Sequence, residues 1–178
     1  RLVVAVGARV DTPDDDGMTS LLYVAYHNGV QFSALLLDTL IELGADINAA
    51  GCPGFASGGG PQTALLSIAL DGALSNDLLM AFIRHGANLN AQNGAGDTVL
   101  HVLRQTACLN PAHFRILIAH GLNLSIRNNE GKVALSPELN GRRYGAHIYG
   151  MEALAAGRRA AEIWPSIKEG RFVEEFLE

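Results

Sequence analysis

Lysine and arginine are scarce in this sequence, and their scarcity limits what the protein can bind. The 178 residues carry 13 basic and 18 acidic side chains, a formal net charge of −5. Binding to nucleic acid requires an excess of Lys and Arg, which displace the counterions around the phosphates. The composition therefore argues against a nucleic-acid partner.

Cysteine is almost absent. Cys52 and Cys108 are far apart and form neither a CxxC pair nor a Cys/His spacing, so the sequence predicts no zinc site and no disulfide framework. Two free thiols suit a reducing compartment, and we expect an intracellular, cytoplasmic location, with an effector delivered into a host cell as the alternative.

Long apolar runs are also missing. No stretch reaches the roughly 18 residues that a membrane-spanning helix needs, so we expect no membrane span. Aromatic residues make up only 6% and charged residues 17%, whereas 48% are apolar. This balance is typical of one globular domain, and the abundance of Leu and Ala favours a helical core. The opening stretch RLVVAVGA matches the end of a helix and not a signal peptide, which predicts that the chain is a piece of a longer protein.

The charge is unevenly distributed along the chain. Residues 1–100 contain ten acidic and three basic side chains, a net charge of −7, and the remaining residues have a net charge of +2. A partner that contacts the first half would meet an acidic surface, which suits a basic protein. The alternative is an ordinary solvated acidic face.

A repeated motif is the strongest feature that the sequence does contain. The stretches VAVGARVDT (4–12), IELGADINA (41–49), IRHGANLNA (83–91) and IAHGLNLSI (118–126) align with one another. In each, an apolar helix end is followed by a glycine and a short extended segment. The glycines stand where a helix C-terminus favours a left-handed residue, and they are Gly7, Gly44, Gly86 and Gly121.

A second motif follows the first at a constant distance. It reads DGMTSLLYVAY (16–26), PQTALLSIAL (61–70), GDTVLHVLRQ (96–105) and GKVALSPEL (131–139). Asp11 precedes Thr19 by eight residues, and Asn90 precedes Thr98 by eight. Asn48 precedes Thr63 by fifteen, so the glycine-rich stretch between them contains an insertion of seven residues.

This glycine-rich stretch, residues 51–60, is neither a linker nor a phosphate-binding loop. The repeat resumes in register after it, no GxGxxG or GxxxxGK[ST] pattern fits it, and no strand-length apolar run precedes Gly51. It is expected to be a surface excursion on a repeated scaffold. Phe55, its one large apolar residue, either contacts a partner or folds back onto the neighbouring loop.

The two motifs together resemble the ankyrin repeat family. The stretches GADINA, GDTVLH and RHGANLNAQNGAG carry the resemblance, which covers roughly residues 1–139. Ser20, Ala64 and Val99 replace the usual proline, and Val133 replaces the usual threonine. The resemblance implies an all-α fold, an ankyrin-type α-solenoid of stacked helix-turn-helix repeats with short β-hairpin fingers and a helical C-terminal cap.

The register of the motifs predicts the boundaries of the units. Residues 1–13 would end an upstream repeat, 14–50, 51–92 and 93–127 would be repeats, and 128–139 would start a degenerate last one. Within the second unit we expect helices at about 62–71 and 75–85, with Ser75 as an N-cap. Pro111 would occupy the first turn of a helix in the third unit.

The apolar positions within these expected helices identify the core. In the second unit they are Leu65, Leu66, Ile68, Ala69, Leu78, Leu79, Phe82 and Ile83, and in the third unit they are Phe114, Leu117 and Ile118.

The histidines are expected to be structural. His85 and His120 precede two of the helix-ending glycines, where a cation favours the helix dipole. Thr98 and His101 match the family's Thr-x-x-His pair, in which the two side chains bond to each other and to the backbone. A catalytic His101 is the alternative, but no nucleophile motif accompanies it. We therefore expect no enzyme activity, no metal site and no cofactor within this chain.

Residues 140–178 lie beyond the repeats and are expected to form a C-terminal helical capping segment. Residues 148–164 are helix-prone, and Pro165 ends that stretch. The arginine pairs of this tail either bind phosphate or an acidic partner or are simply solvated, and they are Arg142, Arg143, Arg158 and Arg159.

The resemblance implies a non-catalytic protein–protein interaction module, monomeric, that binds another protein through its concave face and fingers. The alternatives are a substrate-recruiting part of a larger enzyme or secreted microbial effector, and a purely architectural role. By motif position and residue type, the expected contact residues are Asp15, Asp16, Met18, Tyr26, His27, Phe55, Gln62, Leu70, Asp71, Gln92, Asn93, Asp97, Gln105, Arg127, Asn129 and Lys132.

Overall fold

The protein is mostly helical over the part of the chain that the structure describes. The computed structural model describes residues 9–27, 31–52, 60–106 and 108–135. Within these residues it contains helices and one short pair of strands, in the order α2 (Ser20–His27), α3 (Ala34–Glu42), β1 (Ala50–Gly51), β2 (Gln62–Thr63), α4 (Ala64–Leu70), α5 (Asn76–Arg84), α6 (Val99–Gln105) and α7 (Pro111–Ala119).

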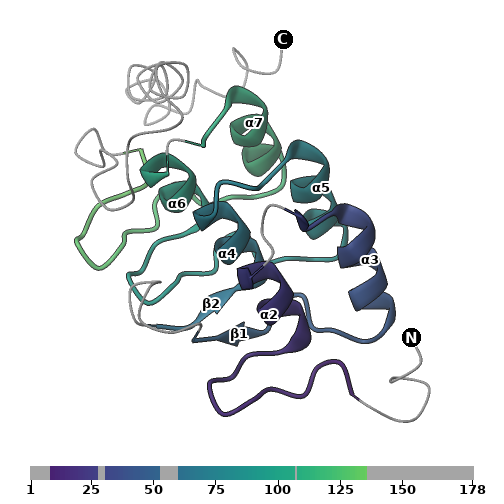
Figure 1. Ribbon diagram of the computed structural model, residues 1–178. Helices are drawn as coiled ribbons and strands as arrows, with labels where there is room; N and C mark the ends of the chain where they lie inside the picture. Colours follow the sequence, from purple (N-terminus) through teal and green to yellow (C-terminus); the bar gives the residue numbers. More distant parts are fainter. Residues whose placement is uncertain (1–8, 28–30, 53–59, 107, 136–178) are drawn as a thin grey trace.

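The helices lie in two rows, and the chain alternates between them. One row contains α2, α4 and α6, in which each helix packs against the next (Figure 1). The other row contains α3, α5 and α7, which pack in the same order. The described parts of the loops that lead back to the first row extend to one side of the molecule (Figure 1). We call these loops finger 1 (residues 12–18), finger 2 (49–62), finger 3 (91–97) and finger 4 (126–132).

Side-chain caps start the helices of the second row. Ser33 accepts a hydrogen bond from the backbone N–H of Leu36, and Ser75 accepts one from Leu78. Such caps satisfy N–H groups that have no partner within the helix. The predicted N-cap at Ser75 is thereby confirmed. Pro111 occupies the first turn of α7, as predicted, where a missing N–H costs nothing.

Glycines in the left-handed conformation end the second-row helices. Gly44, Gly86 and Gly121 have φ angles of 94°, 77° and 87°. This confirms the sequence prediction for three of the four aligned glycines, and Gly7 lies outside the described residues. A side chain at these positions would be strained, because non-glycine residues rarely adopt positive φ.

The core is one cluster of apolar, mostly aliphatic side chains between the two rows. Leu65, Leu66, Ile68 and Ala69 of α4 are buried, which confirms the predicted packing face. The predicted positions of α5 and α7 are also buried, except that Ile83 and Ile118 lie at the edge of the cluster and are half-buried. Burial of these aliphatic side chains supplies most of the stabilisation, at about 25 cal/mol per Å² of apolar surface removed from water.

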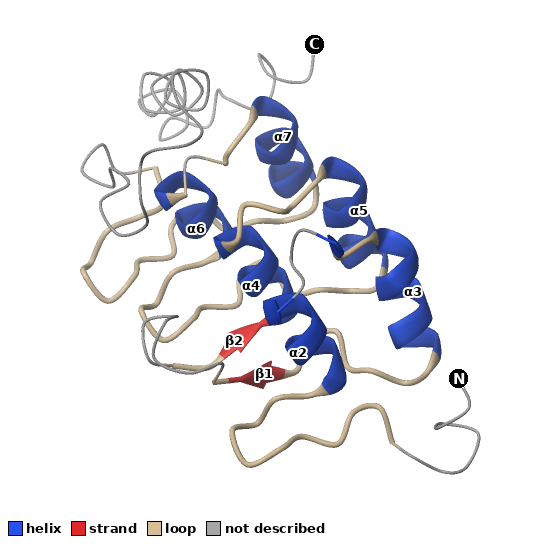
Figure 2. Cartoon of the chain, in the orientation of Figure 1, coloured by secondary structure: helices blue, strands red, loops and turns tan. Residues whose placement is uncertain are grey.

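Finger 2 differs from the others at its base. Ala50 pairs with Thr63 and Gly51 with Gln62 in an antiparallel ladder (Figure 2). The ladder closes the inserted stretch, whose residues 53–59, including Phe55, lie outside the described part of the chain. The helix predicted at about 62–71 begins at Ala64, because residues 62 and 63 belong to this ladder. The expected tail at 140–178 also lies outside the described residues.

Candidate binding surface

The same type of hydrogen-bonded turn occurs at the tips of fingers 1, 3 and 4. The side-chain oxygen of Asp14 accepts bonds from the backbone N–H groups of Asp16 and Met18, at 3.0 and 2.8 Å. Asn93 in finger 3 and Asn128 in finger 4 accept bonds from the residues two and four positions later in the same way. Each turn then contains a glycine at positive φ, and these are Gly17, Gly96 and Gly131. The tips are thus fixed loops whose outward side chains have a defined direction.

Neighbouring fingers contact one another through their backbones. The N–H of Cys52 donates to the carbonyl of Asp16, and that of Asn129 donates to Ala95, both at 3.0 Å. Between fingers 2 and 3, Gly60 and Gly94 approach so closely that a Cβ on Gly60 would lie 2.4 Å from the Cα of Gly94. Only glycine permits this approach. The fingers therefore form one continuous row.

A ladder of polar side chains joins successive helix pairs at the ends of the second-row helices. Asn48 accepts a bond from the N–H of Asn88 at 2.7 Å and donates one to the carbonyl of Gly86 at 3.0 Å. Asn90 repeats both bonds one helix pair later, with Asn123 and Gly121. Asp11, at the same register, accepts from the N–H of Asp46 at 3.1 Å. The spacing between helix pairs is therefore set by the same atoms each time.

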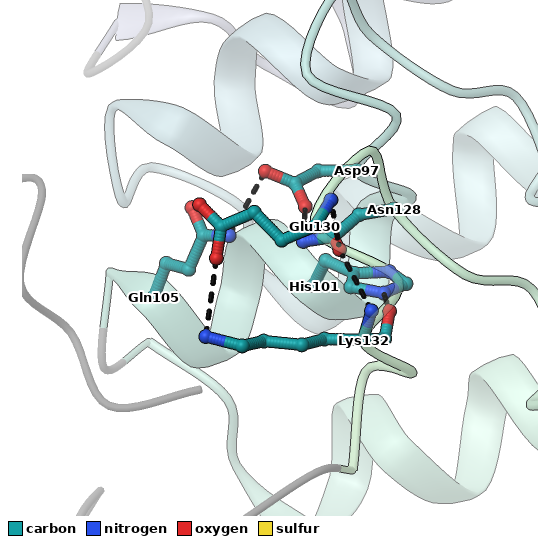
Figure 3. Close-up of polar contacts among 6 residues, drawn as sticks. All are labelled: Asp97, His101, Gln105, Asn128, Glu130 and Lys132. Atoms are coloured by element: carbon teal, nitrogen blue, oxygen red, sulfur yellow. Dashed lines mark hydrogen bonds and ion pairs between the residues drawn. The ribbon is translucent and has the colours of Figure 1, made fainter. Parts of the chain in front are cut away.

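Asp97 is the centre of a buried polar network between fingers 3 and 4 (Figure 3). Its side chain is 4% exposed and accepts bonds from the amides of Gln105 and Asn128, at 2.9 and 2.8 Å. Lys132 forms its ion pair with Glu130, 3.1 Å away, and not with Asp97. Two amide donors satisfy the oxygens of the buried carboxylate, as a buried charge requires. The hydrogen bonds of Asp97 therefore join fingers 3 and 4 to each other and to α6.

His101 lies beside this network and links three segments of the chain. The Nδ1 atom accepts a bond from the N–H of Thr98 at 3.2 Å, so Nε2 carries the proton and donates to the carbonyl of Lys132 at 3.0 Å. The hydroxyl of Thr98 also lies 2.9 Å from Nδ1. Burial lowers the pKa of His101, although the Lys132 carbonyl and Asp97 oppose this effect. The neutral imidazole joins α6 to finger 4 through these hydrogen bonds, in agreement with the prediction that His101 has a structural role.

His85 has a partner that the sequence did not indicate. Its Nε2 atom lies 2.6 Å from a carboxylate oxygen of Asp38 on α3. This bond ties α5 to the preceding helix of the same row. His120, at the equivalent position, is exposed at the end of α7.

The structure sorts the predicted contact residues by exposure. Those with exposed side chains are Asp15, Asp16, His27, Asp71, Gln92, Arg127 and Asn129. Those that are half-buried are Tyr26, Leu70, Gln105 and Lys132. Four are buried, namely Met18, Gln62, Asn93 and Asp97, and Phe55 lies outside the described residues.

The four buried residues hold the fingers and do not present contact atoms. Met18 belongs to the apolar core, and Gln62 donates to the hydroxyl of Ser67 at 2.9 Å. Asn93 and Asp97 form the turn and the network described above. The sequence reasoning chose them by their place in the motif, and motif position alone does not reveal that side chains at the finger bases turn inward.

An aromatic cluster lies at the end of α2. The ring of His27 is 4.4 Å from that of Tyr23 and 5.1 Å from that of Tyr26, the latter in an edge-on arrangement. Tyr23 is 56% exposed, and the sequence reasoning did not include it. The sequence could have indicated Tyr23, because it is an aromatic residue at a position where the equivalent residues of α4 and α6 are the smaller Ser67 and Val102.

Asp71 extends the acidic character of the first half along the row of inner helices. It directly follows α4, at the register that His27 occupies on α2. Its partial burial removes water from the carboxyl group and raises the pKa of Asp71. Asp14, Asp15 and Asp16 are all exposed on finger 1, so the described acidic side chains concentrate at this end of the molecule.

Among the described residues, no group of three or more His, Cys, Asp or Glu side chains is arranged to hold a metal ion. In the same part of the chain, no helix is both long and apolar enough to cross a membrane. No protein-family profile matches the sequence, and a search of curated proteins found no similar chain.

Proposed function

We propose that the protein is an ankyrin-type stack of helix pairs that binds another protein through its fingers and its inner helices, without catalysis. The observation that carries the proposal is the recurrence of two kinds of hydrogen bond along the chain. The fingertip turn occurs at Asp14, Asn93 and Asn128, and the ladder bond occurs at Asp11, Asn48 and Asn90. Such recurrence is what stacked repeats require, because each unit buries its apolar face only against its neighbours.

The inner-helix side of the proposed surface follows from the contacts of Gln105. This residue ends α6 and bonds to Asp97 at the base of finger 3, so its side chain faces the fingers. Tyr26 and Leu70 occupy the same register on α2 and α4 and are half-buried in the same way. A partner lying in the angle between fingers and helices would therefore contact Tyr26. Tyrosine is enriched among residues that dominate binding energy.

Finger 1 gives the surface its charge. Asp15 and Asp16 are exposed at its tip, and the turn beneath them is held by Asp14. A basic partner would associate faster with this end of the molecule than a neutral one, because opposite charges steer the encounter. The exposed thiol of Cys52 beside finger 1 fits a reducing, cytoplasmic location, which we also propose.

The test is a pull-down with this chain, followed by affinity measurement of the retained protein against the variant Tyr26→Ala, Asp15→Lys. Loss of a central aromatic typically costs about 2 kcal/mol, or roughly thirtyfold in affinity. The charge reversal should in addition slow association and weaken its salt dependence. Leu35→Ala is the matched control, because Leu35 is 76% exposed on α3, away from the inner row. Equal affinity of all three proteins would place the binding surface elsewhere.

A further inference from the structure

The residues that end the first-row helices differ in chemistry at one shared register. His27 is the last residue of α2, and Asp71 and Thr106 directly follow α4 and α6. The end of a helix carries partial negative charge and carbonyls without a donor, so a basic group or a hydrogen-bond donor suits it. His27 is basic, and the hydroxyl of Thr106 donates to the carbonyl of Val102 at 3.0 Å. An ionised carboxylate, as in Asp71, is neither basic nor a donor.

The carboxylate of Asp71 has no partner within the described part of the chain. Its backbone N–H bonds to the carbonyl of Ser67, which closes the helix, but its side chain forms neither a hydrogen bond nor an ion pair with any described residue. Partial burial raises the pKa of this carboxyl group. The residue is nevertheless exposed enough for a ligand to reach it. Asp71 is therefore a partly desolvated acid at an unfavourable end of a helix, and a cation would offset both costs.

Asp71 lies inside the row of first-row helices and not at its end. The helix α2 packs on one side of α4, and α6 packs on the other. No lysine or arginine occurs between Arg9 and Arg84, so α2, α4 and the segments that join them contain none. On α6, Arg104 donates to the carbonyl of Ala134. A cation that pairs with Asp71 must therefore come from outside these helices.

Apolar surface lies next to this carboxylate. Leu70 immediately precedes Asp71, and Tyr26 occupies the same register as Leu70 on the adjacent helix α2. Both side chains are half-buried and pack against the core. Lysine and arginine lay their aliphatic stems on such surface and keep the charged head near water. The chemistry at the end of α4 thus suits a long cationic side chain.

We propose that the partner of the concave surface places a lysine or arginine side chain at the end of α4, where its charged head pairs with Asp71 and its stem lies on Leu70 and Tyr26. This inference rests on the binding function proposed above and adds to it the chemistry of one anchor. Asp71 gains its ion pair only when the partner binds, so it contributes to binding at the expense of the stability of the free protein.

The first test is thermal unfolding at neutral pH. Asp71→Asn keeps the size of the side chain and removes its charge, so it should raise the melting temperature by about 2 °C, because a negative charge at a helix C-terminus is unfavourable. Asp77→Asn is the matched control. Asp77 lies in the first turn of α5, where a negative charge is favourable, so this variant should lower the melting temperature.

The second test measures binding of a defined cationic probe by fluorescence anisotropy. The probe is a short rhodamine-labelled peptide of alternating arginine and glycine, and a peptide of alternating glutamate and glycine is its control. Asp71→Asn should weaken binding of the arginine peptide about fivefold, as expected for one partly desolvated ion pair. Asp46→Asn removes the same charge from the turn after α3, where Asn88 and Asn123 form the equivalent bond in the next units. This variant should change binding by less than about twofold.

Four results would overturn the proposal. A lower melting temperature in Asp71→Asn would mean that a cation of the same chain already pairs with the carboxylate. Equal weakening in Asp71→Asn and Asp46→Asn would reduce the effect to net charge. Unchanged binding in Asp71→Asn, or no binding of the arginine peptide to the unchanged protein, would mean that the end of α4 takes no cationic side chain.

The protein retained in the pull-down separates this anchor from the concave surface as a whole. If Tyr26→Ala, Asp15→Lys weakens binding of that protein and Asp71→Asn does not, the surface is correct and the anchor is wrong. If Asp71→Asn weakens it and Tyr26→Ala, Asp15→Lys does not, the contact is at the end of α4 but does not extend to finger 1 and α2.

Discussion

Asn48 shows how much of this architecture depends on single polar side chains. It uses its side-chain oxygen and its amide to hold the turn that follows the next second-row helix. A net contribution of about 1 kcal/mol for each such bond is typical. The repeated asparagine in GADIN and GANLN is therefore explained by a bond to the following unit, and no local role is needed.

Asn48→Ala is expected to lower the free energy of unfolding by about 1–2 kcal/mol, since two inter-unit bonds are lost and the turn after α5 loses its support. Urea unfolding followed by circular dichroism measures this change. Ser125→Ala is the control, because Ser125 has the same register but, among the described residues, its hydroxyl bonds only to Asn123. A loss in Asn48→Ala no larger than that in Ser125→Ala would refute the ladder's contribution.

His101 makes stability depend on pH. Burial lowers the pKa of His101 below the ordinary value of 6.5. Over the pH range between the two pKa values, the imidazole is therefore protonated in the unfolded chain and neutral in the folded chain. Stability from this residue is therefore complete above pH 6.5 and is lost as the pH falls below it. His113, whose pKa burial also lowers, acts in the same direction.

We expect unfolding midpoints in urea to fall between pH 7.5 and pH 5.5, and to fall less steeply in His101→Gln. That variant should also be less stable at pH 7.5, by about 1–3 kcal/mol, because the N–H of Thr98 or the carbonyl of Lys132 loses its partner. His120→Gln changes an exposed histidine and serves as control. If the pH slope of His101→Gln equals that of the unchanged protein, the buried imidazole is not the source of the pH dependence.

At the scale of elements, the sequence predicted best where local chemistry decides the outcome. The sequence predicts Ser75, Pro111 and the glycines Gly44, Gly86 and Gly121 correctly, because caps and positive φ depend on a few adjacent residues. The buried faces of α4 and α5 followed from helical periodicity. The pairing of His85 with Asp38 and the burial of Asp97 could not be foreseen, because both depend on which residue of a neighbouring unit lies opposite.

Finger 2 shows the same limit in more detail. The count of seven inserted residues was available from the sequence, but the way the finger is anchored was not. Gly60 contacts Gly94, and Gly51 is so close to Gly17 that a Cβ on Gly51 would lie 2.4 Å from the carbonyl oxygen of Gly17. These contacts hold both ends of the insertion between fingers 1 and 3.

Removing residues 53–59 restores the length of the other fingers but not their chemistry. Two residues before the threonine, where fingers 1 and 3 have Gly17 and Gly96 at positive φ, the shortened finger has Pro61. Proline cannot adopt positive φ. The deletion alone should therefore cost about 1–3 kcal/mol of stability.

The same deletion combined with Pro61→Gly should melt close to the unchanged protein, because loop-closure entropy changes slowly with length. Thermal unfolding of both variants distinguishes strain from a loss of contacts. Equal destabilisation of the two would mean that residues 53–59 themselves contribute to the core. With the folded variant in hand, an unchanged affinity for the retained partner would show that the inserted loop, with Phe55, makes no contact to it.

At the scale of the whole molecule, the two ends of the inner row differ in how far the described residues cover them. Among the described residues, the α2 end face carries the exposed ring of Tyr23 beside a groove. At α6 the end face is covered by the chain itself. His101 and Arg104 donate to the carbonyls of Lys132 and Ala134, and Leu135 is fully buried. Among the described residues, the α6 end is thus the one that a following segment of the chain covers.

Two truncations test what closes that second end. Ending the chain after residue 127 removes Asn128 from Asp97 and the Lys132 carbonyl from His101, which leaves a buried carboxylate and a buried imidazole each short of a partner. Losing such partners costs about 1–3 kcal/mol for each group, more for the charged one, so this chain should be largely unfolded or aggregated.

Ending the chain after residue 140 keeps both bonds and should leave a folded protein. If residues 140–178 form the predicted cap, its removal exposes apolar surface of the last helix pair, so the melting temperature and the solubility should both fall below those of the full chain. Calorimetry and size-exclusion chromatography measure the three chains. We expect the melting temperature to be highest for the full chain, lower for the chain ending at 140 and lowest for the chain ending at 127. If the chain ending at 140 has the melting temperature of the full chain and stays monomeric, segment 128–135 is sufficient to cover the α6 end. If the chain ending at 127 also has that melting temperature, the Asp97 network does not have the structural role assigned to it.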